Sequence, residues 1–274
     1  MGIPMLIAFG YFLAVAVGFS LGVFGTGGAI LTIPIFVYIW QFQNKQAIAS
    51  GFVIVVLVGL IAAWKHYKDG HINFKLLILF APTAMLGTFF GVSLSHDIPD
   101  GIQLLMLAIV MITSALLMLI PYHTPEEASD GDSSFKIAHP ILFCLLGLSV
   151  GIIVGLVGIG GGFIILPILV SLVHVPMRQA IGTTLMIAIL NAAVGALSCI
   201  QHVSIPWEKV LAFAAIAIAG GVTGAYFNSK LPVPILRKAF ATILILVASF
   251  IAYENVLFFA KGCIFAEVEL PPTS

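Results

Sequence analysis

The sequence predicts an all-α integral membrane protein made of two homologous repeats, each with a glycine-broken helix or hairpin. Three observations support this fold class: the composition, a series of long apolar runs, and a duplicated glycine motif. Of the 274 residues, 61% are hydrophobic and 8% are charged, and the mean hydropathy is +1.19. Soluble globular proteins carry roughly 25% charged residues, so most of this chain cannot face water.

The second half of the chain repeats the first half at a constant offset of 133 residues. The segment Gly22–Pro34 returns as Gly155–Pro167, and the segment Lys45–Ile48 returns as Arg178–Ile181. An ungapped duplication of apolar segments that are broken by glycines is typical of secondary transporters. The repeat therefore bears on function as well as on fold.

The repeat divides the chain into four regions. Residues 1–120 form the first transmembrane repeat, and residues 137–253 form the second. Between them, residues 121–136 contain proline, serine, glycine and acidic side chains, which is typical of a solvated linker. Residues 254–274 form a C-terminal tail, in which the apolar run Val256–Ala266 is too short and too polar to span a membrane.

Each repeat contains five apolar runs, most of them close to the 20 or so residues that a transmembrane helix needs. In the first repeat these are Ile3–Phe24, Ala29–Trp40, Gln46–Trp64, Phe74–Leu94 and Ile102–Ile120. In the second they are Ile137–Val157, Phe163–Val175, Gln179–Ile200, Val210–Phe227 and Ile235–Tyr253.

Loop charges predict that the two repeats face opposite sides of the membrane. The loop Trp64–Lys75 carries three lysines, whereas its equivalent Gln201–Lys209 carries one. The next pair reverses this bias, since Ser95–Gly101 has no Lys or Arg and Asn228–Lys238 has three. Lys and Arg in short loops favour the cytoplasm, so we expect inverted repeats with five crossings each, or three plus a re-entrant hairpin. One broken span over Ile3–Trp40 would instead give four crossings per half and parallel repeats.

The two glycine clusters predict an anion site. A helix start leaves about four backbone N–H groups unpaired, with partial positive charge, and glycine lets a ligand approach the backbone closely. We expect the two breaks to meet near the membrane midplane, although glycines also serve close helix packing. The backbone candidates for substrate binding are Gly25, Thr26, Gly27, Gly28, Gly158, Gly160, Gly161 and Gly162.

Polar side chains recur at the start of the next span in each repeat. Lys45 and Arg178 open these spans, either as entrance charges for an anion or as anchors in the headgroup region. The side chains that we expect to contact substrate, or to hydrogen-bond between helices, are Gln46, Gln179, Ser50, Thr183 and Thr184. Asn191 lies seven residues after Thr184 on the same helical face, and its equivalent in the first repeat is Val58.

Other functional classes find little support in the residues. Net charge is zero, so nothing indicates a nucleic-acid partner. The carboxylates and the histidines, including His66 and His71, fall in predicted loops or at span ends. No spacing of His, Cys, Asp or Glu resembles a metal site, and no nucleophile has an evident base beside it. We therefore expect neither an enzyme nor a bound cofactor.

The motifs Gly155–Gly162, Pro167 and Val175–Thr184 resemble those of the sulfite exporter TauE/SafE family, and the resemblance runs from about Ile7 to Tyr253. Thr184 stands where the family pattern has serine. The first repeat departs further, because Ala49–Gly51 replaces the Gly-Thr-Ser of the pattern. The resemblance implies export or uptake of small sulfur-containing anions, such as sulfite, sulfoacetate or related organosulfonates, across the plasma membrane (the inner membrane of a bacterium). Export is the direction that we predict.

Together these inferences predict a multi-pass secondary transporter that moves a small anion by alternating access. A passive anion channel with the same lining is the first alternative, and a membrane assembly subunit that transports nothing is the second. The partners of the transporter would be the anion, the lipid bilayer and a coupling ion, either a proton or sodium. The sequence also leaves open a homo-oligomer.

Overall fold

The computed structural model describes residues 3–25, 27–95, 98–119, 140–158, 161–173, 175–200, 202–228 and 230–268. Every regular element in these ranges is a helix, which confirms the all-α class. The predicted linker over residues 121–136 lies outside the described residues.

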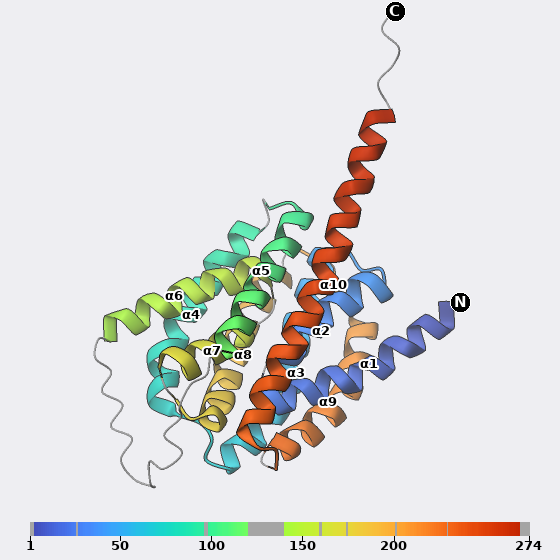
Figure 1. Cartoon of the computed structure of the whole chain (residues 1–274). Helices are drawn as coiled ribbons and strands as arrows, with labels where there is room; N and C mark the ends of the chain where they lie inside the picture. The colour runs from blue at the N-terminus through green and yellow to red at the C-terminus, as the bar shows by residue number, and fades with distance from the viewer. Residues whose placement is uncertain are drawn as a thin grey trace, which may run out of the picture.

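Within the described ranges, both halves contain the same series of helical segments in the same order (Figure 1). The first half holds α1 (Ile3–Phe24), α2 (Gly27–Pro34) running into the π-helical segment η1 (Ile35–Ile39), α3 (Asn44–Lys68), α4 (Phe74–Ser95) and α5 (Asp100–Leu119). The second half holds α6 (Pro140–Val157), α7 (Gly162–Pro167) running into η2 (Ile168–Leu172), α8 (Met177–Ile200), α9 (Trp207–Asn228) and α10 (Val233–Val268). The predicted boundary after residue 253 falls inside α10, which continues as one helix.

Six helices of the described part are long and apolar enough to cross a membrane: α3, α4, α5, α8, α9 and α10. The α2–η1 and α7–η2 segments are too short for a crossing, because at 1.5 Å per residue a helix needs about 20 residues to cover the hydrocarbon core. The protein is therefore a multi-pass membrane protein with one short, glycine-flanked helical segment in each half.

The α1 helix and the α2–η1 segment form a hairpin. The ring of Tyr11 in α1 lies 5.1 Å from the ring of Trp40, the residue that follows η1. A methyl group added to Gly10 would lie 2.2 Å from Nε1 of Trp40. The chain thus reverses direction at its glycines, and the alternative of one broken span over Ile3–Trp40 is wrong.

Glycine permits the turns at both breaks. Gly25, Gly158 and Gly161 have φ angles of +82°, +86° and +77°, in the left-handed region that costs glycine little and costs other residues strain. This conformation ends α1 and α6 abruptly and redirects the chain into the short helices.

Proline determines how the short helices continue. Pro34 and Pro167 lack the N–H that the α-helical ladder needs at their positions, and both helices pass into π-helical turns there. In η1, for example, the N–H of Trp40 donates to the carbonyl of Ile35, five residues earlier, at 3.2 Å. Wide turns of this kind often accompany functional sites in helices.

Small residues join the two halves at two equivalent interfaces, between α1 and α9 and between α4 and α6 (Figure 1). A methyl group added to Gly18 would lie 1.8 Å from the carbonyl oxygen of Ala217, and one added to Gly151 would lie 2.1 Å from that of Ala84. Gly151 is the equivalent of Gly18 in the other half, and Ala84 is the equivalent of Ala217, both at the 133-residue offset. The two contacts are therefore the same contact with the halves exchanged. Backbones therefore touch directly at both interfaces.

The equivalent helices α3 and α8 lie side by side and run in opposite directions. At one end, Nε2 of Gln46 donates to Oγ of Ser204, just past α8, at 3.3 Å. At the other end, the backbone N–H of Asn73, just past α3, donates to Oγ1 of Thr183 at 2.9 Å. Gly59 meets the side chain of Ile189 between these ends.

Candidate functional site

Each glycine break packs against the beginning of the long helix that belongs to the other half. A methyl group added to Gly25 would lie 2.6 Å from the carbonyl oxygen of Ile181 in α8. One added to Gly158 would lie 2.2 Å from Cγ2 of Ile48 in α3. Ile48 and Ile181 are themselves 133 residues apart, so the two arrangements are equivalent.

The two breaks do not share one site. Because α3 and α8 run antiparallel, their first turns lie at opposite ends of the pair, and the 25 residues of α3 cover about 37 Å. The expectation that both breaks meet near the midplane is therefore wrong. Each break instead lies beside the polar first turns of the opposite half. We call the place where Gly25 meets the start of α8 the α8-end site, and the place where Gly158 meets the start of α3 the α3-end site.

At the α3-end site, the second break leads into the buried start of α7, where the first backbone N–H groups of a helix have no intrahelical acceptor. The first helical bonds run from the N–H groups of Ile164 and Ile165 to the carbonyl of Gly161, at 3.1 and 3.2 Å. The N–H groups of Gly162 and Phe163 precede these bonds. Thr26 and Gly160, two of the predicted backbone candidates, lie outside the described residues, and for Gly27 and Gly28 the structure describes only their place in α2.

The predicted hydroxyls are all inside the bundle. Ser50, Thr183 and Thr184 have no exposed surface. Thr183 accepts the bond from Asn73, whereas Oγ of Ser50 and Oγ1 of Thr184 have no hydrogen-bond partner among the described residues. An unpaired buried hydroxyl costs about 1–3 kcal/mol, so these groups need a reason to be there, such as contact with a ligand.

The remaining predicted side chains lie nearer the surface. Gln46, Gln179, Lys45 and Arg178 are all partly exposed. Gln46 is held by its bond to Ser204, and Nε of Arg178 is buried without a partner in the described part of the chain. The positions of Lys45 and Arg178 at the first turns of α3 and α8 agree with a role as charges at the two ends.

Asn191 lies between the two end sites, near the middle of α8. It has no exposed surface, and neither Oδ1 nor Nδ2 has a hydrogen-bond partner among the described residues. An unpaired amide inside a membrane bundle is costly and points to a functional role. Thr184 and Asn191 thus form a line of unpaired polar groups along one face of α8.

The structure corrects the placement of His66, which the sequence put at the membrane interface. Its side chain is 1% exposed, and Nε2 lies 3.2 Å from the carbonyl oxygen of Gly22, one turn before the first break. His71 lies in the loop after α3, and its ring centroid is 6.1 Å from that of His66. Comparing the repeats could have singled out this pair, because the equivalent positions of the second half hold Cys199 and Ser204 in place of the two histidines.

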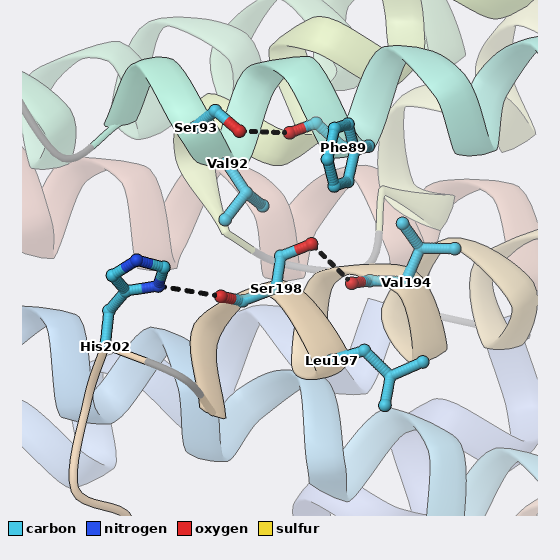
Figure 2. A pocket seen from close by; sticks show the side chains of 7 residues that line it. All are labelled: Phe89, Val92, Ser93, Val194, Leu197, Ser198 and His202. Atoms are coloured by element: carbon cyan, nitrogen blue, oxygen red, sulfur yellow. Dashed lines mark hydrogen bonds between the residues drawn. The ribbon is translucent and has the colours of Figure 1, made fainter.

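A separate cavity of about 580 Å³ lies between α4 and the end of α8 (Figure 2). Its polar groups bond to nearby backbone: the Ser93 hydroxyl donates to Phe89 at 3.0 Å, and the Ser198 hydroxyl donates to Val194 at 2.9 Å. None of the predicted site residues lines it. The lining residues are Phe89, Val92, Ser93, Val194, Leu197, Ser198 and His202.

The spans define the class of protein as a multi-pass membrane protein, and its short glycine-flanked segments and buried polar groups are features that membrane transporters share. The family model described as sulfite exporter TauE/SafE matches residues 11–251. The chain therefore belongs to the sulfite exporter TauE/SafE family, and its location is the plasma membrane.

Several relatives cover most of the chain, and each is named a probable membrane transporter protein. One from Xylella fastidiosa is 29% identical over 87% of this chain and 92% of its own length. The protein YdhB of Bacillus subtilis is 26% identical over 81% of this chain and 90% of its own. One from Methanocaldococcus jannaschii is 27% identical over 82% and 86%. No solved structure gives a significant match.

Proposed function

We propose that this protein is a secondary transporter that exports small sulfur-containing anions, such as sulfite or organosulfonates, by alternating access. The observation that carries the proposal is the pair of equivalent end sites, each made of a glycine break and the polar first turns of the opposite half. Two equivalent sites at opposite ends of an antiparallel helix pair offer the anion one binding place toward each side of the membrane, and a carrier needs to bind or release its substrate at each side in turn.

The proposal includes inverted repeats. Its support is the antiparallel course of α3 and α8, which occupy equivalent places in the two halves. The exchanged contacts of Gly18 with Ala217 and of Gly151 with Ala84 fit a twofold relation between the halves. The opposite directions of α3 and α8 thus support opposite orientations of the two repeats in the membrane.

In this mechanism the anion is held by backbone N–H groups at one break, passes the unpaired groups of Thr184 and Asn191, and reaches the other break. Arg178 attracts it at the α8-end site, and Lys45 does so at the α3-end site. Ser50, Thr183, Gln46 and Gln179 supply further contacts. Non-helical backbone at membrane depth is tolerated where it lines such a path.

The substrate class comes from the family and is tested directly by ligand stabilisation. We expect at least one of sulfite, sulfate, thiosulfate, sulfoacetate and taurine to raise the Tm of the detergent-purified protein, because a ligand of the folded state stabilises it by about 2.7 kcal/mol at 100 times its Kd. The panel is measured with and without sodium, which reveals whether sodium is a coupling ion. A flat response to every compound would contradict the proposed substrate class.

A carrier and a channel differ in their kinetics. We expect proteoliposomes to show saturable uptake of the stabilising anion and stimulation by unlabelled anion on the opposite side. This counterflow follows because a carrier that binds unlabelled anion on the opposite side returns loaded, and a loaded carrier reorients faster than an empty one. Single-channel currents in planar bilayers, without counterflow, would instead support a passive anion channel.

A further inference from the structure

The buried ring of His66 has one defined donor and one unpaired nitrogen. The Gly22 carbonyl 3.2 Å from Nε2 can only accept a hydrogen bond, so Nε2 carries a hydrogen and Nδ1 is the atom that gains or loses a proton. Nδ1 has no hydrogen-bond partner among the described residues, although the side chain is 1% exposed. The His66 ring is thus fixed against the end of α1 by Nε2, while its buried Nδ1 can accept a proton.

His71 makes the site a pair. Its ring centroid lies 6.1 Å from that of His66, and its Nδ1 is also buried without a partner in the described part. Two imidazoles at this separation do not both become charged readily, because like charges repel strongly in a medium of low dielectric constant. The pair therefore holds one proton more easily than two, and the two rings titrate together.

The histidine pair adjoins the α8-end site directly. Gly22, which accepts from His66, lies three residues before Gly25. The carbonyl oxygen of His71 would lie 2.3 Å from a methyl group on Gly182 in α8. Arg178 lies one turn earlier on the same face of α8. An anion held at this break by Arg178 would therefore be a neighbour of the pair.

The charges around the pair favour proton uptake with an anion. The charged groups near the pair are Lys65 and Asp69, which form an ion pair at the end of α3, and Arg178 in α8. The group of α1 that faces the pair is the Gly22 carbonyl. Burial lowers the pKa of His71, Asp69 opposes this change, and Arg178 and Lys65 lower the pKa further. Without an anion, burial and these cations favour the neutral form of His71, and the negative charge of a bound anion would raise the pKa of His71.

We propose that His66 and His71 form a proton site coupled to anion binding at the α8-end site, so that the transporter carries a proton with its substrate. The proton comes from water when the anion binds and returns to water when it leaves. This inference rests on the proposed function. Coupling is confined to one end, because Cys199 and Ser204 occupy the equivalent positions of the α3-end site. Anion affinity is expected to rise as the pH falls from about 8 to 6.

The test is the number of protons taken up on binding. Titration calorimetry with sulfate, thiosulfate, sulfoacetate and sulfite, in two buffers that differ in ionisation enthalpy, gives this number for the purified protein. Near pH 7 we expect an uptake of about 0.5–1 proton in the unmodified protein, and close to none beyond the anion's own contribution in His66→Gln. Glutamine keeps a donor for the Gly22 carbonyl and cannot titrate.

Two further variants keep the test independent of folding. His71→Gln changes a loop position and should also reduce the uptake, whereas His202→Gln, beside the separate cavity, should leave it unchanged. Binding without proton uptake, or an uptake that persists in both His66→Gln and His71→Gln, overturns the proton site and leaves anion transport intact. If no anion binds the unmodified protein, the proposed function fails and the inference fails with it.

Discussion

Replacing Gly151 by alanine is expected to destabilise the protein by about 1–3 kcal/mol, the usual range for overpacking a well-packed interior. The added methyl group would lie 2.1 Å from the carbonyl oxygen of Ala84, and backbone cannot rotate away as a side chain can. The α6 and α4 helices would have to separate. A fall in Tm of the purified protein, with less protein recovered as a monodisperse peak, measures the effect.

Gly51→Ala is the matched control. It places the same methyl group in a long helix, but the nearest atom, Cγ1 of Ile33, lies 3.9 Å away. Alanine also favours helix over glycine by about 1 kcal/mol, so this variant should be neutral or slightly more stable. The equivalent change Gly18→Ala should behave as Gly151→Ala does. Equal stability of the Gly151→Ala and Gly51→Ala proteins would contradict the close backbone contact between the halves.

The sequence predicted the helices well because their signals are local and repeated. The apolar run Phe74–Leu94 became α4 with one residue added at its end, and Gln179–Ile200 became most of α8. The hairpin in the first half could not be separated from a broken span, because Gly25 ends a helix in either case. The contact of Trp40 with Tyr11, which decides between them, is made across the hairpin and leaves no local pattern in the sequence.

The placement of some candidate residues could be predicted, whereas their role in binding stays a prediction. The positions of Ser50, Thr183 and Thr184 in buried turns beside the breaks follow from their place in the repeat. The separation of the two breaks depends on α3 and α8 running antiparallel, which is a property of the tertiary packing. The burial of His66 was missed for a similar reason: it lies near lysines at a span end, and its contacts with Gly22 of α1 and with His71 are tertiary contacts that the sequence does not reveal.

Asn191→Leu is expected to stabilise the protein and to slow transport. Both amide atoms of Asn191 are buried without partners among the described residues, so a leucine of similar size removes a desolvation cost of about 1–3 kcal/mol. If the amide contacts the anion as it passes between the end sites, losing a hydrogen bond to a charged group costs about 1.5–3 kcal/mol. That loss corresponds to a decrease in flux of at least about tenfold.

The opposite signs of these two effects make the prediction specific. Replacing a residue that only fills space would lower the stability of the protein or leave it unchanged. Replacing a residue that is kept for function can raise the stability of the protein while its activity falls. Ser198→Ala, at the separate cavity, is the control for removing a polar group from α8 away from the path, and its flux should match that of the unmodified protein. Thermal unfolding and proteoliposome uptake are measured on the same preparations. A stabilised Asn191→Leu protein with undiminished flux would remove Asn191 from the path, and a destabilised one would show that its amide is paired within the bundle.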